Sequence, residues 1–256
     1  MRFLRSIFFY IFLIVSTLIL GSSAVIGSFI SRAWATFMAR LWGNVNLWAA
    51  GVRVVVTGEE NLNSGPYILV SNHQGWFDIF AALGKLPITF SWLAKEELFR
   101  IPILGNAMAR AGYIPIDRRD RRKAIASMNV VADVVRAGTS VFIFPEGTRS
   151  ADGIMREFKK GAFVMAVKSA QPIVPITISG SYRILPKNSW MIHPGPILFS
   201  IGLPIHSAGA DAEHRDLLMK EVREAIRAKL TPEEAGSENR AAPQTPRGLS
   251  QSGGGN

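Results

Sequence analysis

Two residues that could share a proton, His73 and Asp78, lie five positions apart between two apolar runs, residues 67–70 and 79–83. Around a single helix they would be about 140° apart and would not share a face. If His73 lies in the turn after a strand and Asp78 in the first turn of the next helix, the carboxylate can reach the ring. The carboxylate of such a pair fixes the tautomer and stabilises the imidazolium. The spacing therefore predicts a general base, and a polar turn with Asp78 near a helix start is the alternative.

A second polar segment, residues 145–150, also follows an apolar run. Its Arg149 offers a planar fork of donors that suits a phosphate group. Glu146 could accept a hydrogen bond from a substrate hydroxyl or hold Arg149 in place. Pro145 and Gly147 shape a turn, and Gly147 permits a positive φ. The alternative is a capped loop with a surface Glu–Arg pair.

Further cations follow other expected strands. Residues 117–123 hold five basic and two acidic residues, and Arg118 lies nearest the preceding strand. We expect Arg118 to face a bound phosphate, and Lys95 is a weaker candidate of the same kind. A run of this composition is also typical of a solvated helix face or of attachment to anionic lipid.

Several kinds of chemistry are excluded or disfavoured. The chain has no cysteine, which excludes disulfides, thiolate nucleophiles and zinc–cysteine sites. The four histidines argue against a multi-histidine metal site. No G-x-S-x-G, P-loop or dinucleotide fingerprint occurs. A histidine–aspartate base without a serine nucleophile indicates that the substrate supplies the hydroxyl.

Alternating strands and helices predict an α/β fold with a mainly parallel or mixed sheet flanked by helices. Pro115 favours an edge or terminal position for its strand. We expect the domain to cover residues 51–230 and a disordered tail to cover 231–256, where large apolar residues are scarce. The expected strands are 52–56, 67–70, 88–94, 112–116, 140–144, 173–178 and 197–201. The expected helices are 77–83, 95–98, 106–111, 117–137, 157–169 and 211–230.

Residues 1–50 read as a two-helix membrane anchor, with an apolar helix at 7–28 and an amphipathic helix at 29–50. A cleaved signal peptide is the alternative for the first helix, and packing on the soluble domain is the alternative for the second. The anchor could span the bilayer once or dip into one leaflet as a hairpin. The net charge of +10 also suits an anionic membrane, and we expect no nucleic-acid partner.

Four blocks in this order resemble a known family. Residues 72–78 fit N-H-x-x-x-x-D, and residues 144–150 match F-P-E-G-T-R-S residue for residue. Residues 112–118 resemble the second block more loosely, and residues 174–176 give the V-P-I of the fourth. The chain thus resembles the membrane glycerolipid acyltransferases, specifically the 1-acyl-sn-glycerol-3-phosphate acyltransferases, over about residues 50–205.

The resemblance implies a glycerol-3-phosphate acyltransferase-like fold and a role for each matched residue. His73 would act as general base and Asp78 would orient it. The acyl donor would be acyl-CoA or acyl-carrier protein, the acceptor a lysophospholipid in the bilayer, and the product phosphatidate. No metal and no organic cofactor would be required. The active site would face the cytoplasm, at the inner or plasma membrane if the source is bacterial. The expected substrate-binding residues are Glu146, Gly147, Thr148, Arg149, Arg118, Lys95 and Pro175.

Two other functions stay open at this point. The acceptor could be another lysolipid or glycerol 3-phosphate. The chain could also be a non-catalytic membrane protein that binds anionic lipid through the basic run at residues 117–123.

Overall fold

The structure is a computed structural model that describes residues 2–63, 65–117, 121–206 and 212–236. Its centre is one mixed sheet with the strand order β1-β7-β6-β2-β5-β3-β4. All neighbouring strands are parallel except β6 and β7, which are antiparallel. The predicted fold class is confirmed, and β4, which holds Pro115, is an edge strand. The strands are β1 Arg53–Thr57, β2 Ile68–Ser71, β3 Ser91–Lys95, β4 Ile114–Ile116, β5 Val141–Ile143, β6 Ile173–Ser179 and β7 Pro196–Ile201.

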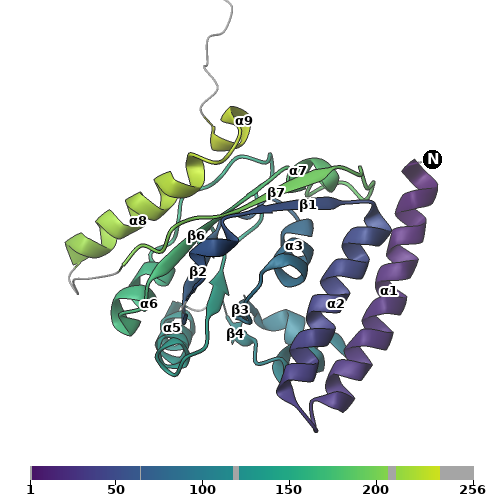
Figure 1. The fold of residues 1–256 in the computed structure, drawn as a ribbon, viewed down its shortest axis with the longest axis horizontal. Coiled ribbons are helices and arrows are strands. Elements are labelled where there is room, and N and C mark those ends of the chain that lie inside the picture. The colour runs from purple at the N-terminus through teal and green to yellow at the C-terminus, as the bar shows by residue number, and fades with distance from the viewer. Residues whose placement is uncertain (1, 64, 118–120, 207–211, 237–256) are drawn as a thin grey trace, which may run out of the picture.

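Helices cover both faces of the sheet (Figure 1). On one face lies α3, with α2 and α1 outside it, and on the other lie α5, α6 and α8. The helices are α1 Arg2–Gly27, α2 Arg32–Ala50, α3 Phe77–Lys85, α4 Leu104–Arg110, α5 Arg121–Arg136, α6 Gly161–Ser169, α7 Ser181–Ile184, α8 Ala212–Arg227 and α9 Pro232–Ala235, with short 3-10 turns at Glu59–Asn61 and Glu96–Arg100.

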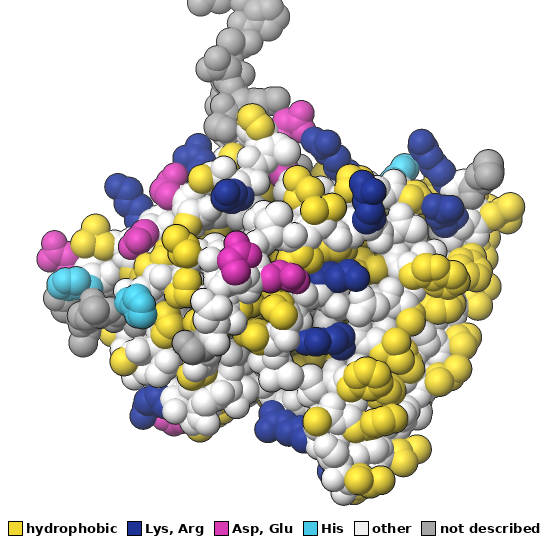
Figure 2. Space-filling model, viewed as in Figure 1, with side chains coloured by type: hydrophobic (Ala, Val, Ile, Leu, Met, Phe, Trp, Pro, Cys, Tyr) yellow, Lys and Arg dark blue, Asp and Glu magenta, His cyan; other side chains and the backbone are white. Residues whose placement is uncertain are grey.

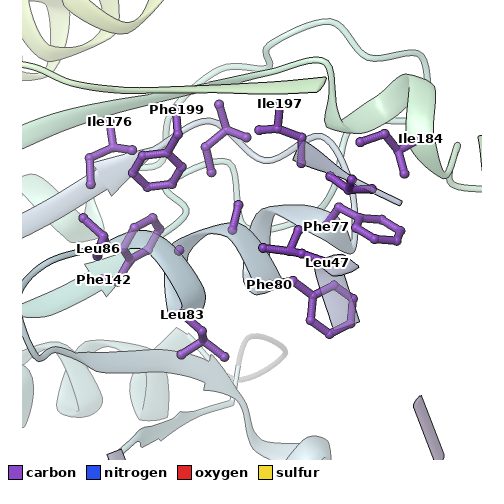
Figure 3. Close-up of a cluster of buried hydrophobic side chains, with 14 of the residues drawn as sticks. Leu47, Phe77, Phe80, Leu83, Leu86, Phe142, Ile176, Ile184, Ile197 and Phe199 are labelled. Carbon is purple, nitrogen blue, oxygen red and sulfur yellow. The ribbon is translucent and has the colours of Figure 1, made fainter. Parts of the chain in front are cut away.

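The central strands are apolar on both sides because both faces of the sheet are covered. In β2, Leu69 joins the core under α3, while Ile68 and Val70 join the core under α5 and α6. Figure 3 shows the α3 side, where Phe77 of α3 and Phe142 of β5 lie in the same buried cluster. This packing fixes α3, and therefore the turn that precedes it, against the sheet.

The N-terminal helix α1 lies along the domain rather than apart from it. Ile192 donates a backbone hydrogen bond to Ser6 Oγ at 2.9 Å, and the buried ring of Phe9 lies 5.5 Å from that of Phe77. Further along, Ala24 packs in a cluster with Ala111. Among the described residues, α1 is the one helix long and apolar enough to cross a membrane, which is consistent with membrane association.

The second helix, α2, packs against α3 and also presents aromatic side chains to the outside. Trp34, Phe37 and Trp48 are exposed, while Met38 and Leu47 are buried. The two alternatives weighed for this segment are therefore compatible: one face packs on the domain and the other is free. Figure 2 shows hydrophobic side chains gathered over the α1 and α2 side of the molecule.

Some predicted boundaries are wrong. The helix expected from residue 157 begins at Gly161, because the preceding segment is tied elsewhere. There Arg156 donates a backbone hydrogen bond to the Glu146 carboxylate, and Lys159 donates one to the Pro145 carbonyl. The strand expected from residue 88 begins at Ser91.

The tail expected from residue 231 begins with ordered structure instead. Thr231 and Glu234 form a capping box that starts α9, and the Glu234 side chain is buried. Composition missed this helix because its stability comes from contacts with distant segments rather than from apolar surface. The rest of the expected tail, residues 237–256, lies outside the described residues.

Candidate active site

The histidine turn joins β2 to α3 at the edge of the sheet where β2, β5 and β6 all end. These strands are parallel, so the loops that follow them meet at one edge. Asn72 anchors the turn to β6: its side chain donates to the Ile178 carbonyl at 2.7 Å and accepts from the Ile178 N–H at 2.9 Å. The start of the turn is thereby fixed from a neighbouring strand.

The predicted pair is formed. His73 Nδ1 lies 2.8 Å from Asp78 Oδ2, and the His73 side chain is 11% exposed while Asp78 is fully buried. The same Asp78 oxygen accepts the backbone N–H groups of Gln74 at 2.7 Å and Gly75 at 2.9 Å. The carboxylate thus orders the turn and orients the ring at once, which leaves Nε2 as the ring nitrogen available to a substrate.

The loop after β5 holds the histidine from the other side. The ring of Phe144 stacks on that of His73, with centroids 3.8 Å apart and planes 8° apart. Glu146 Oε1 accepts the His73 backbone N–H at 2.7 Å, and the Ser150 N–H donates to the His73 carbonyl at 2.8 Å. The two motif loops therefore form one unit.

Glu146 is a buried carboxylate beneath this unit. One oxygen accepts the His73 N–H and the other accepts the Arg156 N–H at 3.1 Å. Burial raises the pKa of Glu146 to about 7; the backbone hydrogen bonds oppose that rise and the nearby Asp78 charge adds to it. This position gives Glu146 a role in holding the catalytic loop, and the substrate contact expected of it stays a prediction.

Arg149 lies beside the histidine turn. Its guanidinium stands 4.8 Å from the centre of the exposed Trp76 ring, a cation–π contact within the two motif loops. Burial lowers the pKa of Arg149 and the Asp78 charge raises it. Gly147 has φ 76°, and a Cβ there would meet Lys159 Nζ at 2.9 Å, so this turn needs glycine. Thr148 is exposed at the tip of the loop.

The remaining predicted site residues lie apart from the pair or outside the described residues. Lys95 ends β3, two strands from β2, and its ammonium lies 3.0 Å from Glu97. Pro175 is buried within β6, where its ring lies close to Gly202. Arg118 lies outside the described residues. Substrate contacts for these three residues stay predictions.

An apolar cavity of about 510 Å³ is lined by residues of the sheet and of helices α5 and α6. Phe144, Pro145 and Gly147 line it, so it begins beside the motif loop. Four cations stand among its lining residues: Lys159, Lys160, Lys168 and Arg215. An apolar cavity of this size suits a hydrocarbon chain.

Sequence reasoning missed several residues that build the site. It assigned no role to the Phe144 ring, to Gln74, whose side chain donates to the Gly153 carbonyl at 3.0 Å, or to the Arg156 amide. Only the F-P-E-G-T-R-S match could have drawn attention to Phe144. The other two act across loops distant in sequence, and no local pattern marks them.

Comparison with known proteins agrees with this geometry. Residues 53–179 match the family model described as Acyltransferase. A chloroplastic 1-acyl-sn-glycerol-3-phosphate acyltransferase of Arabidopsis thaliana is 37% identical over 81% of this chain and 61% of its own length. The 1-acyl-sn-glycerol-3-phosphate acyltransferase of Pseudomonas aeruginosa is 33% identical over 80% of this chain and 82% of its own length. This chain spans about three fifths of the length of the chloroplastic relatives that it matches.

A solved structure is similar over most of the chain. The crystal structure of the 1-acyl-sn-glycerophosphate (LPA) acyltransferase of Thermotoga maritima aligns with a TM-score of 0.77 and 27% identity. The alignment covers 89% of this chain and 95% of that one. The likeness therefore extends well beyond the residues that the family model matches.

Proposed function

Since this chain belongs to the 1-acyl-sn-glycerol-3-phosphate acyltransferase family, we propose that it makes phosphatidate by acylating the free hydroxyl of 1-acyl-sn-glycerol 3-phosphate. The observation that carries this proposal is the buried His73–Asp78 pair at 2.8 Å. Across the described residues, no serine, threonine or tyrosine hydroxyl lies within hydrogen-bonding distance of the His73 ring. The ring is thus free to act on a hydroxyl that arrives with the substrate.

The reaction replaces the C–S bond of the thioester with a C–O bond, and it involves one proton transfer to His73 and one from His73. His73 Nε2 takes the proton of the acceptor hydroxyl as its oxygen attacks the thioester carbonyl of acyl-CoA or acyl-carrier protein. Asp78 stabilises the imidazolium that forms. The tetrahedral intermediate then collapses: the C–S bond breaks, the new C–O bond remains, and the leaving thiolate takes the proton from His73. These steps need neither a metal nor an organic cofactor.

Two features suit the substrates. Arg149 lies against the histidine turn and offers a guanidinium for the acceptor's phosphate. The apolar cavity beside Phe144 would hold an acyl chain close to the ring. Arg118, Lys95 and the loop backbone at Gly147 would complete the acceptor site.

The acceptor and the product both live in a bilayer, and α1 offers the attachment. Its contacts with the domain run from Ser6 to Ala24, nearly its whole length. A helix that crossed the bilayer upright would carry the domain in with it, so we favour a hairpin of α1 and α2 that dips into one leaflet. The active site would then face the cytoplasm, where thioester donors occur.

The test is thiol release from acyl-CoA by the purified protein in detergent. The chain has no cysteine, so a thiol reagent reports released CoA without background from the protein. We expect release only when 1-acyl-sn-glycerol 3-phosphate is present, loss of release in His73→Ala, and no change in His206→Ala, which alters an exposed histidine. Activity near wild type in His73→Ala would overturn the mechanism. Turnover with a different lysolipid, but not with this one, would overturn the assigned acceptor.

A further inference from the structure

The C-terminal helix α9 lies outside the residues that the family model matches, yet it holds a fully satisfied buried carboxylate. Glu234 is 6% exposed. Its Oε2 accepts the Ser179 hydroxyl at 2.6 Å and the Thr231 N–H at 3.2 Å, and its Oε1 accepts the Gly180 N–H at 2.8 Å. Burying a carboxylate is costly unless several donors compensate for lost water, so these contacts are specific.

The main chain of Glu234 binds a second segment. Its carbonyl accepts the Met155 N–H at 2.9 Å. One residue therefore ties the end of β6, through its side chain, to the segment at residues 150–156, through its backbone. Glu233, the preceding residue, instead forms an exposed ion pair with Arg183.

The two segments that Glu234 joins flank the catalytic turn. In the segment at residues 150–156, the N–H of Arg156, next to Met155, donates to Glu146, and Glu146 in turn accepts the His73 N–H. The Gly153 carbonyl in the same segment accepts the Gln74 side chain.

On the other side of the turn, the segment after β6 approaches closely. The Ser181 carbonyl lies 3.1 Å from where a Cβ on Gly75 would stand. A shift of either flanking segment would thus move the backbone of the turn. The distance between His73 Nδ1 and the Asp78 carboxylate depends on that backbone.

We infer that Glu234 is a positioning residue for the His73–Asp78 pair, and that this one side chain links α9 to the catalytic turn. The inference rests on the proposed function for its kinetic readout. It concerns geometry alone, since Glu234 touches neither reacting atoms nor the His73 ring. Displacement of reacting groups by about 1 Å can cost on the order of a hundredfold in rate.

The kinetic test compares Glu234→Ala with the matched control Glu233→Gln, which changes an exposed neighbour in the same short helix. We expect kcat for thiol release to fall about tenfold to a hundredfold in Glu234→Ala, with KM for each substrate within about threefold of wild type. Glu233→Gln should stay within about twofold, in line with weak exposed ion pairs. A kcat within twofold of wild type in Glu234→Ala, or an equal loss in Glu233→Gln, would overturn the inference.

A second variant and a second readout cover the case where Glu234→Ala fails to fold. Ser179→Ala removes one donor to the Glu234 carboxylate and should lower kcat less than Glu234→Ala does. In the double variant with Glu234→Gln, the two losses should not add, because both changes break the same contact. Additive losses would contradict the link.

Amide hydrogen exchange needs no turnover. Glu234→Gln should speed exchange at His73 and Arg156 relative to Glu233→Gln. If the wild-type protein releases no thiol with 1-acyl-sn-glycerol 3-phosphate but exchange rises as expected, the proposed function fails and the positioning role stands. Unchanged exchange at both amides would overturn the positioning role itself.

Discussion

Asp78 offers a way to separate charge from geometry in the catalytic pair. Its Oδ2 accepts from the ring of His73 and from the backbone of Gln74 and Gly75, while Oδ1 is buried with no partner among the described residues. In Asp78→Asn the amide oxygen can take the place of Oδ2 and the NH₂ group the place of Oδ1. All three donors then keep an acceptor and the negative charge is lost, while the NH₂ group takes the buried place of Oδ1, which has no partner among the described residues.

The expected loss follows from the distance between the two groups. With Nδ1 and Oδ2 at 2.8 Å, the charge centres of the imidazolium and carboxylate are about 4 Å apart, and their attraction is about 4 kcal/mol at an effective dielectric constant of about 20. The transition state carries part of the full charge, so we expect Asp78→Asn to lose about 2–4 kcal/mol of stabilisation. That loss corresponds to a fall in kcat of about 30- to 1,000-fold.

Asp78→Ala should differ in stability as well as in activity. It leaves the ring N–H of His73 and the N–H groups of Gln74 and Gly75 without their acceptor. An unsatisfied buried donor costs about 1–3 kcal/mol; Asp78→Ala leaves three such groups and Asp78→Asn one, so Asp78→Ala should be at least about 2 kcal/mol less stable than Asp78→Asn. The kcat of both variants is measured by thiol release, and their unfolding free energy by denaturant titration in detergent.

Two results would refute this reasoning. If Asp78→Asn keeps a kcat within about fivefold of wild type, the carboxylate charge does not stabilise the transition state. If Asp78→Asn is as unstable as Asp78→Ala, the amide oxygen does not satisfy the three donors, and the assigned geometry of the turn is wrong.

Three further predictions follow from single contacts. The pKa of Glu146 is raised from 4.5 to about 7, so between these two pH values the folded protein keeps a proton that the unfolded chain loses. The unfolding free energy should therefore fall by about 1.4 kcal/mol per pH unit as the pH rises through that range. An equal slope in Glu146→Gln would contradict this. Arg149→Lys keeps the charge but loses the planar fork beside Trp76, so KM for the lysophospholipid should rise about tenfold and KM for acyl-CoA should not; parallel rises would argue against a phosphate contact. Phe9→Ala should cost about 3–5 kcal/mol in denaturant unfolding because that ring is buried, whereas Phe8→Ala, at an exposed ring, should cost little; similar costs would place α1 away from the domain.

The elements were predictable where local pattern decides them. Every predicted strand occurs within a few residues of its expected place, because runs such as residues 141–143 bury apolar side chains on both faces of the sheet. The edge position of β4 is one of the two positions that Pro115 predicted, since proline cannot donate to a neighbouring strand.

Two of the failures share one cause. Residues 157–160 carry a helix-like pattern, but the backbone of Arg156 and Lys159 bonds to the loop after β5 instead. Residues 231–236 look like the start of a tail, but Glu234 finds its donors at Ser179 and Gly180. In both places the partner lies beyond the reach of any local window.

By itself, the sequence determined which residue types stand at the ends of the strands. The spacing of His73 and Asp78 around a strand-to-helix turn is a local property, and so is the glycine turn that presents Arg149. Local backbone geometry and side-chain chemistry allow a base and an anion-binding group there, and the motifs at residues 72–78 and 144–150 favour these roles over a polar turn and a capped loop.

Only the tertiary structure decided how these groups are held. Strand order brings the loop after β5 beside the histidine turn, so that Glu146 binds the His73 amide and Phe144 stacks on its ring. It also brings Glu234 to the end of β6. Such contacts join residues tens of positions apart, and their formation depends on which strands become neighbours, which local periodicity does not specify.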